Sequence, residues 1–157
     1  CIQCGFCCDG TLFSKAKMEE GDSESLKSLT EIKPFTTKDF FELPCPYFTD
    51  KCSVYDKSKP KVCGTFYCSQ IKKFYTNGIS YETVEQNIYS LKKSIENFRI
   101  YLKDNYPQFY NMPIKSIFDF LKKNEREIES KKSRTKYASL HLQFQPVLAK
   151  PELFLGN

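Results

Sequence analysis

The first ten residues, CIQCGFCCDG (residues 1–10), hold half of the eight cysteines in the chain. The first three follow one another at three-residue intervals, and the last two are adjacent: Cys1, Cys4, Cys7 and Cys8. A tight Cys-x2-Cys turn directs two thiols toward one point, and a third thiol three residues further continues the same wrap. The stretch therefore predicts a segment folded around a metal ion or a cluster.

The other four cysteines follow at Cys45, Cys52, Cys63 and Cys68, and residues 69–157 contain none. Disulfides are one explanation of an even number of cysteines, but disulfide-dense domains are usually small folds that lack a sufficient core. Here the cysteine-free part has ample apolar residues of its own. In addition, few thiols within eight residues of each other can reach disulfide geometry. Metal binding is therefore favoured over a disulfide framework.

Two kinds of metal centre suit these spacings. Cys-x2-Cys-x2-Cys with a distant Cys-Pro pair, here Cys45-Pro46, is the arrangement of bacterial-type [4Fe–4S] ferredoxins. Eight thiolates also divide naturally into two four-cysteine zinc sites, or into one two-metal site with bridging sulfurs. An iron–sulfur cluster (4Fe–4S) and zinc both stay open as the cofactor.

The cysteine segments resemble those of a known family. CIQCGFCCDGTLF (1–13), LPCPYFTDKCSVY (43–55) and KPKVCGTFYC (59–68) are similar to the CxxCxxCC cysteine-cluster family. These YkgJ-like proteins are described as zinc- or iron-chelating domains. The resemblance covers residues 1–68 and implies that all eight cysteines bind metal: Cys1, Cys4, Cys7, Cys8, Cys45, Cys52, Cys63 and Cys68.

The chain departs from the family pattern beside the last cysteines. Where the family has Arg-Pro and then Cys-Arg, this chain has Lys59-Pro60 and Cys63-Gly64. The interval between Tyr55 and the proline is also one residue longer than usual. The cysteine set is intact, but a role for those arginines, such as binding an anionic substrate, does not carry over.

Three functions are compatible with such a centre. The first is a metal-binding protein whose metal stabilises the cysteine-rich half. The second is a cluster-dependent enzyme for methyl transfer or redox chemistry, implied by a related cysteine cluster in flagellin lysine-N-methylases. The third is a metal carrier or sensor. No nucleotide fingerprint or acid–base pair is recognisable, so no catalytic residue is assigned. Asp9 is the one carboxylate that could support the ligands, although an Asp-Gly pair is more often a turn.

The fold is expected to be mainly α, as a single domain over residues 1–157. We expect a loop-rich, metal-binding half over 1–70 and a helical half over 71–157 that ends in an extended tail. Residues 33–41 are expected to turn into a short helix, and residues 69–76 to form another that Asn77-Gly78 stops. Two longer helices are predicted from apolar stripes at three- and four-residue steps, over 80–105 and 113–130. In the tail, the alternation of Leu140, Leu142 and Phe144 predicts a strand or an extended segment.

Charge and hydropathy limit the partners. No window approaches the length of uninterrupted apolar sequence that a membrane span requires, so we expect a soluble, cytoplasmic protein that does not bind membranes. The net charge of +5 is concentrated in the second half, with KKSRTK at 131–136 as its densest run. Cations at the C-terminal end of a helix explain this run better than nucleic-acid binding does. Metal ions are the expected partners, and a partner protein is compatible with the sequence.

Overall fold

The computed structural model describes residues 4–29, 39–57, 59–124, 134–148 and 154, and for Arg134–Ala138 and Leu148 the backbone only. The protein is mainly α, as predicted, with one small two-stranded sheet among the described residues. It divides into two compact units, unit 1 (Cys1–Phe66) and unit 2 (Tyr67–Asn157). The expectation that the whole chain is a single domain stays a prediction.

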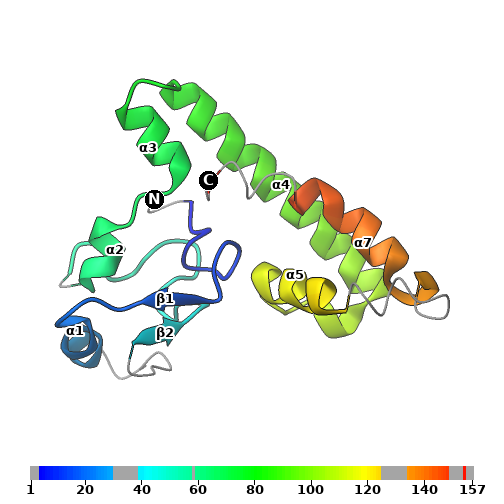
Figure 1. Ribbon diagram of the computed structural model, residues 1–157, viewed down its shortest axis with the longest axis horizontal. Helices are drawn as coiled ribbons and strands as arrows, with labels where there is room; N and C mark the ends of the chain where they lie inside the picture. The colour runs from blue at the N-terminus through cyan, green and yellow to red at the C-terminus, as the bar shows by residue number, and fades with distance from the viewer. Residues whose placement is uncertain (1–3, 30–38, 58, 125–133, 149–153, 155–157) are drawn as a thin grey trace. The chain divides into compact units, whose positions relative to one another are not determined.

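Unit 1 combines short elements with long connections (Figure 1). Its helices are α1 (Asp22–Leu29) and α2 (Lys61–Thr65), and its strands are β1 (Lys15–Lys17) and β2 (Phe40–Glu42). The strands pair antiparallel, with Ala16 opposite Phe41. Apolar side chains from the turns, from α1 and from β2 form the core, namely Phe6, Leu12, Leu26, Phe41, Tyr47 and Val54. Unit 1 therefore has a core despite its low content of regular structure.

The short helix predicted over residues 33–41 is wrong at its described end. Residues 30–38 lie outside the described residues, and β2 begins at Phe40. Along this strand Phe41 is buried in the core, whereas the Phe40 ring faces outward under Lys15, whose Nζ lies 4.4 Å from the ring centroid. Adjacent aromatic residues on opposite faces suit a strand better than a helix, because strand side chains alternate.

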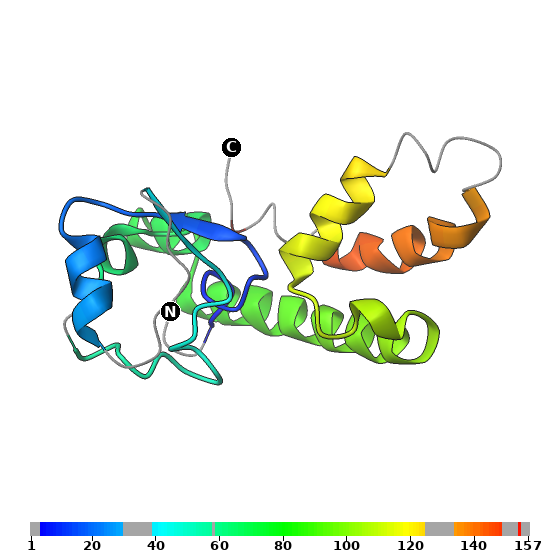
Figure 2. The same ribbon diagram turned by 90° about the horizontal axis from the view of Figure 1, so that it is seen from below.

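Unit 2 is a set of helices packed along one long member (Figure 2). They are α3 (Ser69–Tyr75), α4 (Tyr81–Asn105), the 3-10 turn η1 (Pro107–Phe109), α5 (Ile114–Lys123) and α7 (Arg134–Leu148). The long helix α4 contacts α3, η1 and α7, and α5 contacts α7. Buried apolar side chains line these contacts, namely Val84, Leu91, Phe98, Leu102, Ile114, Ile117, Leu121, Leu140, Phe144 and Val147.

The helices that open unit 2 begin and end where the sequence predicts. Helix α3 stops before Asn77, which has a φ of 56°, and Gly78 donates its N–H to Lys73 O. Ser80 caps α4 because its hydroxyl accepts a hydrogen bond from the N–H of Thr83. Helix α5 is shorter than predicted, since it ends at Lys123 and residues 125–133 lie outside the described residues.

The extended tail predicted around Leu140 is wrong, because this segment forms α7. Leu140, Phe144 and Val147 are 0–1% exposed and are spaced by four and three residues, which places them on one face of a helix. Leu142, which belonged to the predicted alternation, is 68% exposed. The spacing of Leu140 and Phe144 fits both the two-residue repeat of a strand and the four-residue repeat of a helix. The segment forms a helix, which packs against α4.

Two further findings concern charge and hydropathy. Residues 134–136 of the basic run open α7, so they lie at the N-terminal end of a helix and not at the C-terminal end that we expected. Over the described parts of the chain, no helix combines the length and apolarity needed to cross a membrane.

Candidate metal centre

The opening cysteine stretch folds as a tight double turn. Gly5 and Gly10 have φ values of 77° and 78°, which other residues rarely adopt. Gly5 O accepts hydrogen bonds from the N–H groups of both Cys8 (2.6 Å) and Asp9 (2.9 Å), which closes the first turn. Asp9 Oδ1 accepts a hydrogen bond from the N–H of Thr11, as the Asp-Gly turn predicts. These bonds fix the backbone that carries Cys8.

Two other segments, the connection between β2 and α2 and the helix α2 itself, bring three cysteines to the same region. Cys45 follows β2 and donates its N–H to Cys8 O at 2.7 Å, which joins two segments 37 residues apart in the sequence. Cys52 lies in the following loop, where it forms an antiparallel bridge with Phe48. Cys63 is the third residue of α2 and lies within its first turn. Each of these cysteines is therefore held by backbone hydrogen bonds or by a helix.

These four cysteines line one pocket in unit 1. Its volume is about 80 Å³, and its wall is otherwise apolar and aromatic apart from Lys59. The lining residues are Cys8, Leu26, Phe41, Cys45, Tyr47, Phe48, Cys52, Val54, Tyr55, Lys59, Pro60 and Cys63. Of the other cysteines that the structure describes, Cys4 and Cys7 do not line this pocket, although they lie in the same turn as Cys8.

Burial and mutual proximity disfavour negative charge on Cys8, Cys45 and Cys63. Burial raises the pKa of Cys8 from 9.0 to about 12, and the neighbouring Cys45, Cys63 and Cys52 add to the effect. Burial also raises the pKa of Cys63 to about 11, again with contributions from Cys45 and Cys52. The pKa of Cys45 is raised by burial, against a hydrogen bond from the backbone of Tyr47. A nearby cation would therefore favour the thiolate form of Cys8, Cys45 and Cys63.

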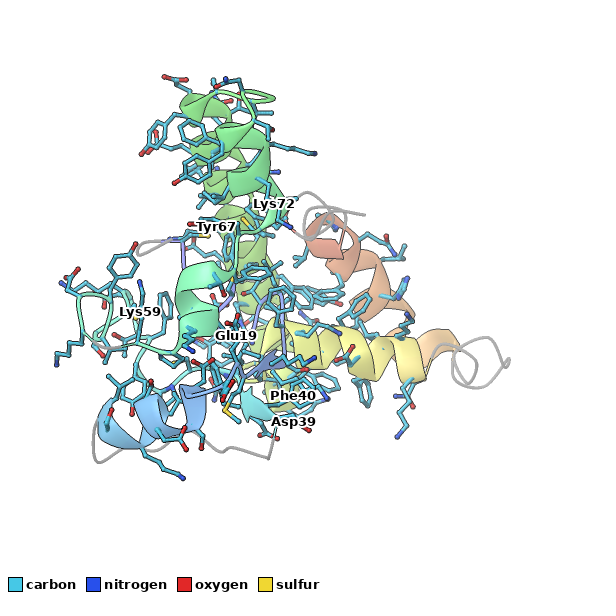
Figure 3. All side chains as sticks on the ribbon, turned by 60° about the vertical axis from the view of Figure 1, so that its left-hand side comes forward. Glu19, Asp39, Phe40, Lys59, Tyr67 and Lys72 are labelled. Atoms are coloured by element: carbon cyan, nitrogen blue, oxygen red, sulfur yellow. The ribbon has the colours of Figure 1, made fainter. Side chains whose placement is uncertain are left out.

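Lys59 supplies one positive charge at the wall of this pocket (Figure 3). Its Nζ lies 3.8 Å from the centroid of the Tyr55 ring, a distance that suits a cation–π contact. Lys59 also lowers the pKa of Cys63, although burial and the other thiols outweigh it. Tyr55 and Lys59 stand at positions that the family pattern marks, and their stacking was not predicted.

The remaining predicted ligands are Cys1, Cys4, Cys7 and Cys68. Cys1 falls outside the described residues. Cys4 and Cys7 are half-buried in the opening turn. Cys68 precedes α3 as its N-cap residue and belongs to unit 2. The joint role of all eight cysteines as ligands therefore stays a prediction.

The four cysteines of the pocket are a donor set that suits a metal, although their side chains are not arranged around a common point. Cys8, Cys45, Cys52 and Cys63 are free thiols. Four cysteine sulfurs are the donor set of structural zinc sites and of iron–sulfur clusters. Among the described residues, no three side chains of Cys, His, Asp or Glu are already arranged to hold an ion. Coordination therefore requires these thiols to turn toward one another.

Comparison with protein families agrees with this donor set. A family model matches residues 1–94, which cover unit 1, α3 and the first half of α4. The chain belongs to the CxxCxxCC family. The description of that family reads "Putative zinc- or iron-chelating domain", so the predicted resemblance is confirmed and metal chelation is supported at this level. No curated protein and no solved structure matches the chain.

The CxxCxxCC match extends beyond the last cysteine. The predicted resemblance ended at residue 68, whereas the family model continues to residue 94. The additional residues include α3 and the part of α4 whose apolar side chains Val84 and Leu91 are buried. The family region therefore includes helices of unit 2 as well as the cysteine-bearing loops.

The raised pKa values predict how the metal-free protein responds to alkali. As the pH rises above 9, the thiol of Cys8 ionises in the unfolded chain but stays protonated in the folded one until about pH 12. The unfolding free energy should therefore fall across this interval, by up to about 1.4 kcal/mol per pH unit for this thiol. Urea denaturation with a chelator and a reductant at pH 8 and pH 10.5 measures the fall. It should be shallower in Cys8→Ser, and an equal fall in both proteins would contradict the assignment.

Proposed function

We propose that this protein binds a thiolate-ligated metal in the pocket formed by Cys8, Cys45, Cys52 and Cys63. The observation that carries the proposal is the convergence of four cysteines, from three separate segments of the chain, on one pocket of unit 1. A bound cation offsets the burial and the mutual repulsion that raise the thiol pKa values. Binding then displaces protons from the thiols, so affinity should rise with pH.

The role of this metal is primarily to stabilise unit 1. Its helices and strands are short, and the cysteines that line the pocket come from the opening turn (Cys8), from the connection between β2 and α2 (Cys45 and Cys52) and from α2 (Cys63). A metal that joins these segments restricts the unfolded chain and supplies folding free energy. The other predicted metal ligands are Cys1, Cys4, Cys7 and Cys68. The spacing of the cysteines in the sequence supports a role for them in metal binding as well.

The metal is proposed to be zinc or an iron–sulfur cluster, and the two share the same thiolate chemistry. The ferredoxin-like argument groups Cys45 with Cys1, Cys4 and Cys7. In this structure Cys45 instead bonds to the backbone of Cys8, and it shares its pocket with Cys52 and Cys63. This grouping weakens the specific case for a ferredoxin-type cluster, while the four-cysteine donor set suits both metals.

Elemental and sulfide analysis of protein purified anaerobically tests the proposal. A zinc centre predicts at least one zinc per chain without acid-labile sulfide. A cluster predicts iron with a matching amount of sulfide, and a brown colour that air removes. Addition of a strong chelator should lower the unfolding temperature in either case. Protein that holds neither metal and shows the same unfolding temperature with and without chelator would contradict the proposal.

A further inference from the structure

A carboxylate outside the cysteine pattern reaches the helix that carries Cys63. Asp22 is the first residue of α1, and it is 0% exposed. Its Oδ1 accepts a hydrogen bond from the N–H of Lys61 at 2.6 Å, and its Oδ2 accepts one from the N–H of Val62 at 3.4 Å. The Oδ2 atom also accepts a bond from the N–H of Glu19 at 2.9 Å. Both carboxylate oxygens are therefore engaged by backbone donors.

These bonds replace a cap that α2 lacks. The residue before the helix is Pro60, whose side chain makes no capping hydrogen bond. The first N–H groups of a helix have no hydrogen-bond partner within the helix. A buried N–H group that finds no partner elsewhere lowers the stability of the fold. Asp22 satisfies the N–H groups of Lys61 and Val62 from 39 and 40 residues away in the sequence. The start of α2 is thus fixed by α1.

A second contact ties the other end of α2 to the same segment. The hydroxyl of Thr65, the last residue of α2, donates a hydrogen bond to Glu19 Oε1 at 2.9 Å. Figure 3 shows Glu19 beside this helix. The Glu19–Asp22 segment therefore holds a five-residue helix at both ends. A helix of this length is too short to be stable by itself, so its position depends on such contacts.

We propose that Asp22 is a positioning residue for the metal centre, which holds α2 so that Cys63 stays at the pocket that it shares with the other three thiols. This inference rests on the function proposed above. Cys63 lies two residues after Lys61 and one after Val62, directly beside the backbone groups that Asp22 binds. Asp22 is not itself a ligand of the metal, because its oxygens are occupied by three backbone N–H groups.

Residue-specific alkylation of the metal-loaded protein tests the proposal. Iodoacetamide is added to the native protein, and peptide mass spectrometry measures the modification of Cys8, Cys45, Cys52 and Cys63. In Asp22→Asn, Cys63 should react about tenfold faster or more, since hydrogen bonds to a charged group are lost beside it. The other three thiols should change much less. Asp56→Asn is the matched control, because Asp56 is exposed, and it should behave as the wild type.

A second variant covers the case in which Asp22→Asn is recovered unfolded. Lys61→Pro removes one N–H donor of the capping contact and keeps the carboxylate, and proline is favourable at the first position of a helix. The same selective rise at Cys63 is expected. In the double variant, the rise should be smaller than the product of the two single effects, because both changes remove the same bond.

Four outcomes distinguish the positioning role of Asp22 from the proposed metal binding itself. A selective rise at Cys63 supports the positioning role. An unchanged Cys63 in folded Asp22→Asn, or an equal rise at all four thiols, would overturn it, because the second pattern reports a general loss of stability. Wild-type protein in which all four thiols react as fast with its metal as after chelation would instead refute the proposed function.

Discussion

Cys8→Ser is expected to weaken metal binding in the four-cysteine pocket and to make the other three thiols there more reactive. Of the four cysteines, Cys8 has the most interactions with the others. Its backbone O accepts a hydrogen bond from the N–H of Cys45, and negative charge on the other three thiols raises its pKa. Structural zinc sites contribute about 10–16 kcal/mol, so the loss of one of four ligands should cost roughly 3 kcal/mol and weaken binding about a hundredfold. Competition with a chromophoric chelator measures the change in affinity.

Cys7→Ser is the matched control for this experiment. Cys7 is the neighbour of Cys8 in the same turn but does not line the pocket. Alkylation in the presence of metal should therefore modify Cys45, Cys52 and Cys63 in Cys8→Ser and leave them protected in Cys7→Ser. Equal protection of these three thiols in the two variants would contradict the grouping, whatever the total metal content.

Gly5→Ala is expected to destabilise the metal-loaded protein by about 2–6 kcal/mol. Gly5 has a φ of 77°, a conformation that costs other residues roughly 1–3 kcal/mol. A Cβ atom there would also overlap the ring of Phe48, and forced overpacking costs about 1–3 kcal/mol more. The turn that Gly5 closes carries Cys8, so the metal should be held less tightly as well. Urea denaturation measures the loss of stability.

Two variants separate the causes of this effect. Gly64→Ala places the same methyl group inside α2, where its nearest neighbour would be Lys59 Cε at 3.9 Å. It should leave stability unchanged or raise it by up to about 1 kcal/mol, because alanine favours helix. Phe48→Ala should relieve the overlap, so part of the cost of Gly5→Ala should disappear in the double variant. A Gly5→Ala protein as stable as Gly64→Ala would contradict the close approach of Phe48.

The regular spacing of apolar residues made most of the helices of unit 2 predictable from the sequence. The stripe of α4 has three- and four-residue steps over many turns, and local signals mark its ends, with Ser80 before it and Pro107 after it. The segment of α7 was misread because Leu140 and Phe144 satisfy two periods at once. Only their burial, and the 4.7 Å separation between the rings of Phe98 and Phe144, show which period the fold uses.

The sequence predicted metal chelation by cysteines, but it did not predict which cysteines line the same pocket. Thiol number and spacing indicate metal, since no other side chain offers the same soft donor. Which cysteines meet depends on contacts between distant segments, such as the hydrogen bond from Cys45 to Cys8. Asp22 could not be found in this way, because its partners lie 39 and 40 residues further along and no motif links them. Long-range backbone bonding leaves no local signal in a single sequence.

X-ray absorption at the metal edge of the anaerobically purified protein tests the central claim most directly. Four sulfur neighbours per metal, at about 2.3 Å, are predicted for a thiolate site. In Cys8→Ser the sulfur count at this centre should fall. A metal surrounded only by nitrogen and oxygen would contradict the account, and so would metal-free protein with disulfides among Cys8, Cys45, Cys52 and Cys63.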